Sequence, residues 1–235
     1  STNIGPYLID MPDLVVEKSS YAINNLPQMD YGNKPSDGSN LIFQNTNDLN
    51  DLVKLYPYSS RFIRKYIGSD ECIHSYFRHC LWIEDKDLDF ALAIPWILGR
   101  VNAVREVRTA SKGKQSNDAA SSAHRFVYTP HQNGWAIVIP RVSSENRPYL
   151  PFNITKDDAI IADTAAAIYN PETWLISILA SRMHQQWIAT VCVRLETRYR
   201  YSNTLGWNTF PVPTMTEQNK VDLTRCAQDI LLARE

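Results

Sequence analysis

One stretch of the chain, Arg194–Tyr201, alternates charged side chains with aromatic and other uncharged ones. In an extended backbone successive side chains point to opposite faces, so Glu196, Arg198 and Arg200 would share one face. An arginine can donate two hydrogen bonds to the O6 and N7 atoms of guanine, and a glutamate can accept one from the amino group of cytosine. On a strand or a tight loop, this spacing favours reading of base edges in the major groove. A solvated edge strand with an internal salt bridge is the alternative.

Motifs for the catalytic chemistry of nucleic acids are missing from the sequence. A methyltransferase needs a glycine-rich turn after a strand, and an adenine-N6 enzyme also needs an Asn/Asp-Pro-Pro-aromatic loop. The nearest approach, Asn170-Pro171-Glu172, is typical of a helix start. The glycines of Gly32–Gly38 lack the Gly-Lys-Ser/Thr ending of a phosphate-binding loop, and no nucleophile-elbow pattern is found. We therefore predict no catalytic residue.

Metal-dependent chemistry has one weak candidate. Glu84-Asp85-Lys86 fits the acid-x-lysine half of a PD-(D/E)xK nuclease site at the end of an expected strand, but no Pro-Asp partner lies upstream at a useful distance. The histidines lack the spacing of paired metal ligands; they are His74, His79, His124, His131 and His184. We predict no metal site, and a nuclease around Glu84 and Lys86 stays open as an alternative.

The charge distribution favours a local anion-binding face. The 235 residues have a net charge of −1, but residues 94–147 carry eight positive and three negative side chains, and residues 181–201 carry four and one. Two basic stretches in an otherwise acidic chain can form a surface for phosphates, although chance fluctuation of charge explains them equally well.

The cysteines and the hydropathy pattern indicate the compartment. Cys72, Cys80, Cys192 and Cys226 are scattered and form no CxxC pair, which indicates reduced thiols in the cytoplasm. The sequence has neither a membrane-spanning apolar run nor a secretory pattern at its start. Because it begins at Ser1 without an initiator methionine or a helix-capping pattern, we expect a piece of a longer protein.

The elements that must position these residues are predicted from periodicity and turn chemistry. Residues 1–46 are predicted to form an extended arm. The rest of the chain is predicted to have an α+β fold with a mixed or antiparallel sheet and several long helices. The expected elements are two short helices in 47–66, a strand over 72–84, a helix over 87–114, a hairpin of 125–129 with 135–142, strands in 149–154 and 159–169, a helix from 170 to 194, and a last helix after Thr214.

Several collinear motifs resemble those of the MmeI-like type IIL restriction–modification enzymes. They are Gly32–Gly38, Ile63–Ser69, Arg105–Arg108, Ile139–Glu145, Ser181–Trp187, Arg194–Leu205 and Trp207–Pro213. The resemblance covers nearly the whole chain. In that family one polypeptide carries a nuclease, an adenine-N6 methyltransferase that uses S-adenosylmethionine, and a target-recognition domain, and the part that this sequence resembles is the last of these.

The resemblance implies a domain organisation and a partner. Residues 1–46 would be an arm or linker from an upstream methyltransferase domain, residues 47–213 the target-recognition domain, and residues 214–235 a C-terminal helix. The partners would be double-stranded DNA and the methyltransferase domain in cis. This fragment would hold no cofactor, because S-adenosylmethionine would bind in the parent's methyltransferase domain.

The resemblance also places base-reading positions in and around these motifs. The residues expected to read bases are Arg141, Asp163, Thr164, Glu196, Arg198 and Arg200. Residues at a helix end that leads into a loop are expected to contact phosphates; these are Arg105, Arg108, Lys112 and Lys114. The parent could equally be a phage-defence methyltransferase without nuclease activity, and a protein-interaction module whose basic stretches are incidental is a further alternative.

Overall fold

Two units make up the fold of the computed structural model, and each is built from separate stretches of chain. The structure describes residues 15–156 and 159–234. Unit 1 comprises residues 1–30, 134–155 and 166–235, and unit 2 comprises residues 31–133 and 156–165. The predicted α+β class is confirmed, with helices and three small sheets in the described part of the chain. The division into arm, recognition domain and C-terminal helix stays a prediction.

Unit 2 is organised around a four-stranded sheet in the order β2-β4-β3-β8. Its strands are β2 (Ile42–Phe43), β4 (Arg78–Leu81), β3 (Ile63–Ile67) and β8 (Ala159–Ile161). β3 runs antiparallel to β4 and parallel to β8. Apolar residues of the sheet, among them Ile42, Leu81 and Ile160, are buried together with side chains of the neighbouring helices. Burial of this apolar surface is the main force that holds the unit together.

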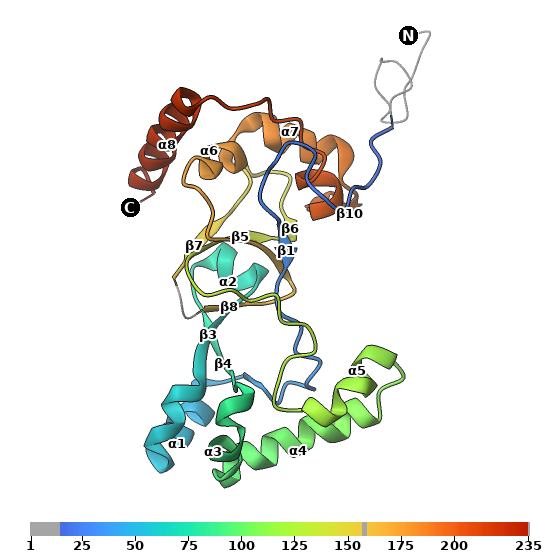
Figure 1. Cartoon of the computed structure of the whole chain (residues 1–235), viewed down its shortest axis with the longest axis vertical. Helices are drawn as coiled ribbons and strands as arrows, with labels where there is room; N and C mark the ends of the chain where they lie inside the picture. Colours follow the sequence, from blue (N-terminus) through green and yellow to red (C-terminus); the bar gives the residue numbers. More distant parts are fainter. Residues whose placement is uncertain (1–14, 157–158, 235) are drawn as a thin grey trace. The chain divides into compact units, whose positions relative to one another are not determined.

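The α-helices described in unit 2 are α1 (Thr46–Leu55), α2 (Ser69–His74), α3 (Leu88–Leu92), α4 (Pro95–Thr109) and α5 (Lys114–Asp118). In Figure 1, α1, α3, α4 and α5 of unit 2 lie toward one end of β3 and β4, and α2 lies at the other end of β3. The side chain of Asn45 caps α1 by accepting from the N–H of Asp48 at 2.9 Å. Pro95 starts α4, where its missing N–H costs no helical hydrogen bond. Val101 and Val104 face the core from α4.

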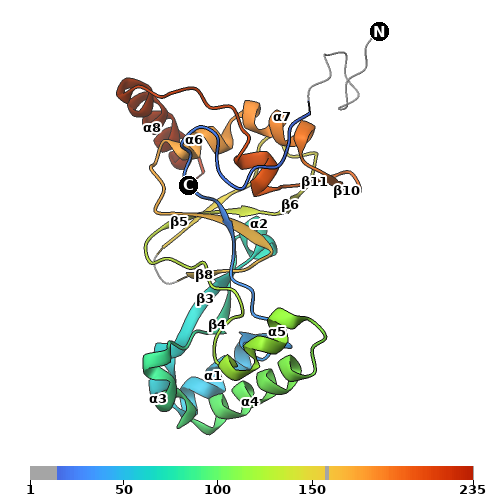
Figure 2. The same cartoon turned by 45° about the vertical axis from the view of Figure 1, so that its right-hand side comes forward.

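Unit 1 holds two sheets. The larger has the order β1-β9-β5-β7, with β1 (Asp30–Tyr31), β9 (Ala165–Tyr169), β5 (Ala136–Pro140) and β7 (Asn153–Thr155). Two of the boundaries between the units fall within β1 and β9, and the others lie between residues 133 and 134 and between 155 and 156. The smaller sheet has the order β10-β11-β6, with β10 (Arg194–Leu195), β11 (Arg198–Arg200) and β6 (Val142–Ser143). Figure 2 shows β10 and β11 as a hairpin beside β6.

The α-helices described in unit 1 are α6 (Leu175–Ala180), α7 (Arg182–Val191) and α8 (Glu217–Leu232), and a π-helical turn spans Asn203–Trp207. Ser181 separates α6 from α7 and caps α7 by accepting from the N–H of His184 at 3.0 Å. A capping box of Thr216 and Asn219 opens α8. Trp207 is fully buried and its indole N–H donates to the carbonyl of Pro27 at 2.8 Å, which fixes the segment before β1. None of the described helices is both long and apolar enough to cross a membrane.

Some predicted elements are wrong in type or extent. The strand expected over 72–84 is confined to β4, because α2 continues to His74 and ends at Ser75 in the left-handed region with φ 58°. The expected hairpin of 125–142 is absent among the described residues, because Tyr128 pairs with Lys34 instead. The helices expected over 87–114 and 170–194 each form as two helices, since backbone breaks precede Pro95 and fall at Ser181.

His184 packs inside an aromatic cluster of unit 1, and this burial predicts a pH-dependent stability. Burial lowers the pKa of His184 from 6.5 to about 3. Between these values the unfolded chain binds a proton that the folded chain does not, so stability falls as pH falls, by about 1.4 kcal/mol per pH unit. In urea unfolding we expect His184 to account for a loss of about 2 kcal/mol between pH 6.5 and 5. The His184→Gln variant, which cannot take up this proton, should show a shallower slope; an equal slope would contradict the assignment.

Candidate nucleic-acid interface

The stretch Arg194–Tyr201 forms a tight β-hairpin, so the single extended strand with three charged residues on one face is wrong. Arg194 pairs with Tyr199 and Leu195 with Arg198, which leaves Glu196 and Thr197 as a two-residue turn. Glu196 adopts φ 58°, a left-handed conformation that lets the chain reverse. The hairpin form corresponds to the tight loop that the sequence also allowed.

Glu196 and Arg198 present a preformed pair at the tip of this hairpin. A guanidinium nitrogen of Arg198 donates to the Glu196 carboxylate at 2.7 Å, and both side chains are largely exposed. An exposed ion pair of this kind contributes little to stability. The pair places the carboxylate of Glu196, an acceptor, beside the guanidinium of Arg198, a forked donor, on a surface open to solvent.

The hairpin is joined to β6, and this brings Arg141 to the same sheet. Arg200 pairs with Val142, and the N–H of Tyr201 donates to the carbonyl of Arg141 at 2.8 Å. The Tyr201 side chain is buried, with its hydroxyl 3.1 Å from Nε2 of His184. The structure therefore collects four of the six predicted base-reading residues on one small sheet and anchors that sheet in the core of unit 1.

Glu145 is a residue of this surface that sequence reasoning missed. It lies in the turn after β6, and a hydrogen bond from the Thr197 side chain holds its pKa below the usual range, with help from Arg194 and Arg198. The guanidinium of Arg194 lies 5.1 Å from the ring centre of Tyr199. The signal in the sequence that could have pointed to Glu145 is its position as the last residue of the Ile139–Glu145 motif. Acidic and basic groups thus alternate around the hairpin tip.

Asp163 and Thr164, the other two predicted readers, occupy a tight turn of unit 2. The N–H of Ala165 donates to the carbonyl of Ala162 at 2.9 Å and closes the turn, while the N–H of Asp163 donates to Asn33 at 3.1 Å. Thr164 is exposed, beside Ser69. Because this turn belongs to unit 2 and the hairpin to unit 1, the base-pair assignments that combine them stay predictions.

The predicted phosphate contacts separate into exposed and buried residues. Arg105, Lys112 and Lys114 are exposed on α4 and at the start of α5. Arg108 is 0% exposed, and its guanidinium donates only to backbone carbonyls of the unit itself, which are those of Pro35, Ser36, Ala119, Ser122 and Arg125. The prediction of a phosphate contact is wrong for Arg108, because a buried and fully engaged guanidinium cannot reach a ligand.

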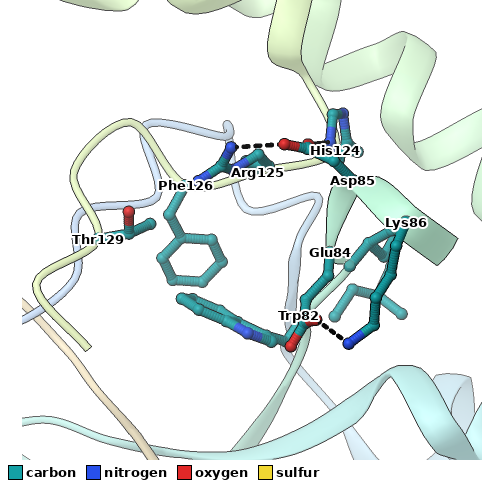
Figure 3. A pocket seen from close by; sticks show the side chains of 10 residues that line it. Trp82, Glu84, Asp85, Lys86, His124, Arg125, Phe126 and Thr129 are labelled. Atoms are coloured by element: carbon teal, nitrogen blue, oxygen red, sulfur yellow. Dashed lines mark hydrogen bonds and ion pairs between the residues drawn. The ribbon is translucent and has the colours of Figure 1, made fainter. Parts of the chain in front are cut away.

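A cavity of about 290 Å³ in unit 2 contains the residues of the nuclease alternative (Figure 3). Lys86 lies 2.5 Å from the carboxylate of Glu84, and this pairing lowers the pKa of Glu84. Asp85 accepts from Arg125 at 2.9 Å and lies 2.8 Å from His124. The charged groups of the cavity are therefore satisfied by each other. Among the described residues there is no group of three or more acidic, histidine or cysteine side chains placed to hold a metal ion.

Comparison with known proteins identifies the family. The family model "MmeI, target recognition domain" matches residues 10–214. The chain is 36% identical over 234 residues to "DNA methyltransferase A" of Bacillus subtilis (strain 168), covering 100% of this chain and 26% of that protein. It also matches the solved structure of the type IIL restriction–modification enzyme MmeI in complex with DNA, with a TM-score of 0.94, 35% identity, and coverage of 100% of this chain and 31% of that one. The chain thus spans between a quarter and a third of the length of these relatives, and it belongs to the MmeI target recognition domain family.

Proposed function

We propose that this chain reads the sequence of double-stranded DNA for an adenine-N6 methyltransferase or restriction–modification enzyme of which it is one part. The observation that carries the proposal is the exposed Glu196–Arg198 pair on a sheet shared with Arg141 and Arg200. A solved relative of the same fold is described in complex with DNA, which supports the same conclusion. The chain itself performs no chemistry in this proposal and positions the target adenine for the catalytic domain.

Each reading pair would recognise one base pair from the major groove. Arg198 donates to guanine and Glu196 accepts from cytosine, so together they fit the two edges of a G·C pair. Arg141 with Asp163 would read another G·C pair, and Thr164 with Arg200 a third base pair. Each such pair discriminates against a wrong base by about 1–3 kcal/mol.

Arg105, Lys112 and Lys114 would contact phosphates and supply affinity without sequence information. Each phosphate contact lowers the slope of log K against log salt by about 0.9, so replacing all three with alanine should make the slope shallower by about 2.7. The preferred DNA word should not change. Fluorescence anisotropy titrations at salt concentrations of about 50 to 200 mM measure this slope. An unchanged slope would show that these side chains do not meet phosphates.

The parent protein supplies what this chain lacks. One relative is named DNA methyltransferase A, and the proposed cofactor of the parent is S-adenosylmethionine, bound outside this chain. The sequence contains neither the glycine-rich turn nor the Asn/Asp-Pro-Pro-aromatic loop that would hold it, so the methyltransferase domain in cis is the required partner. We place the protein in the cytoplasm as part of prokaryotic defence. A parent without nuclease activity would use the same reading surface.

A chimeric enzyme tests the proposed function. The matching segment of the Bacillus subtilis DNA methyltransferase A is replaced by this chain, and methylated adenines are mapped across a plasmid. We expect methylation within a new short word, because the catalytic domain is retained while the reading surface differs. The unmodified enzyme and a chimera carrying Glu196→Ala and Arg198→Ala serve as controls. Methylation of the original word by the chimera would contradict the proposal.

A further inference from the structure

The hairpin tip that presents the Glu196–Arg198 pair has little support of its own. Two residue pairs, Arg194 with Tyr199 and Leu195 with Arg198, join β10 to β11. Glu196 adopts φ 58°, and a residue other than glycine keeps this left-handed conformation where the surrounding structure holds it. The side chains of the turn are exposed. A contact from a neighbouring segment is therefore needed to fix the tip in one orientation.

The pairing of β11 with β6 brings Glu145 to the tip. Tyr199 pairs with Ser143, and the two strands run antiparallel. Two residues further along the same register, Glu145 falls opposite Thr197. The ladder itself ends at Ser143, but the chain continues close enough to the hairpin for the Thr197 hydroxyl to donate a hydrogen bond to the Glu145 carboxylate.

The segment that carries Glu145 is anchored to a helix of unit 1. The N–H of Arg147 donates to the carbonyl of Ser144 at 3.3 Å and closes a turn that contains Glu145. The carbonyl of Arg147 accepts from the side-chain amide of Gln185 at 2.6 Å, and Gln185 is a buried residue of α7. This turn is thus held by α7, and Glu145 extends the support from α7 to the hairpin.

We propose that Glu145 positions the Glu196–Arg198 pair through Thr197, so that the acceptor and the forked donor reach the two edges of one base pair together. This inference rests on the proposed reading of DNA. Thr197 lies between the two readers in the chain, so a hydrogen bond that holds Thr197 fixes the backbone on both sides of it. A tip that is already ordered loses less conformational freedom on binding, and it keeps its donor and acceptor at the geometry that the correct base pair requires. Glu145 is a positioning residue, because it acts through Thr197 and does not touch the base.

Two pairs of variants separate the hydrogen bond from the charge and the shape of these side chains. Glu145→Gln keeps an oxygen that can accept from Thr197 and removes the charge, whereas Glu145→Ala removes both. Thr197→Ser keeps the hydroxyl, whereas Thr197→Val keeps the shape and removes the hydroxyl. A variant that combines Glu145→Ala with Thr197→Val tests whether the two residues act as one unit, because partners in a single contact lose no more together than singly.

The measurement is competition binding by the full chain to duplexes that differ from its selected word at single base pairs. The base pair assigned to Glu196 and Arg198 is identified by replacing both with alanine. We expect Glu145→Ala, Thr197→Val and their combination each to reduce discrimination at that base pair by about 2- to 5-fold, the effect of losing one exposed hydrogen bond. Glu145→Gln and Thr197→Ser should retain the discrimination, and preference at the other positions of the word should not change.

Three results would overturn the inference while leaving the proposed function intact. The first is unchanged discrimination in Glu145→Ala. The second is an equal loss of preference at every position, which would mean that Glu145 only stabilises the fold. The third is a loss in Glu145→Gln as large as in Glu145→Ala, because the charge and not the hydrogen bond would then matter. If the unaltered chain selects no word at all, the proposed function fails, and the inference fails with it.

Discussion

Replacement of Arg108 by methionine is expected to lower the free energy of unfolding of the chain by about 3–5 kcal/mol. Arg108 lies on α4 and its guanidinium donates to five backbone carbonyls at 2.6–3.1 Å. These carbonyls belong to three separate segments, residues 35–36, 119–122 and 125. Methionine fills similar space but removes this donor from every one of them. The expected loss is less than five times the cost of about 1–3 kcal/mol for one unsatisfied buried group, because the Ser122 carbonyl still accepts from the N–H of Arg125.

Two further variants separate this structural role from a loss of charge. Arg108→Lys keeps the charge but lacks the forked, five-proton geometry, so it should recover less than half of the loss. Arg105→Ala, one helical turn earlier and exposed, should change stability by less than about 0.5 kcal/mol. Urea unfolding followed by circular dichroism measures all three. An Arg108→Met variant as stable as the unaltered chain would contradict the role assigned to Arg108.

The second large effect is expected in base preference. Replacing Glu196 and Arg198 together by alanine should abolish discrimination at one base pair, a change of about 5- to 150-fold or 1–3 kcal/mol. The physical reason is that the acceptor and the forked donor act on the two edges of the same base pair. Preference at every other position should be retained, because Arg141 and the Thr164 turn keep their own backbone contacts.

Arg194→Ala is the matched control for this pair. Arg194 is an exposed arginine of the same hairpin, but its guanidinium lies over the Tyr199 ring. Its loss should weaken binding evenly across sequences. Competition binding with duplexes that differ at single base pairs distinguishes the two results. A uniform loss of binding in the double variant would make Glu196 and Arg198 elements of a phosphate contact instead.

The sequence was informative where local chemistry decides the structure. The start of the last helix is an example: the sequence predicts a helix after Thr214, and α8 begins after the cap residue Thr216. The charged cluster at Arg194–Arg200 is recognisable from residue types alone, but its hairpin is not, because the turn uses Glu196 at a positive φ and lacks the Asn-Gly signal of such turns.

Long-range contacts account for the remaining errors. Nothing in the spacing of Arg105 and Arg108 tells which one faces the core, because burial of Arg108 depends on carbonyls from 11 to 73 positions away in the chain. The sequence predicts a hairpin of residues 125–129 with 135–142, yet Tyr128 pairs with Lys34, and a boundary between the units falls between residues 133 and 134. The place of Glu145 at the end of a sequence motif does not show that it meets Thr197, because that contact depends on the pairing of β6 with β11.

The most direct test of DNA reading is selection by the unaltered chain from a randomised duplex pool at low salt, followed by sequencing. We expect enrichment of a short asymmetric word that contains an adenine, with a G·C pair at the position assigned to Glu196 and Arg198. Binding that falls with salt and enriches no word would leave only a basic surface and would contradict the claim that this chain reads sequence.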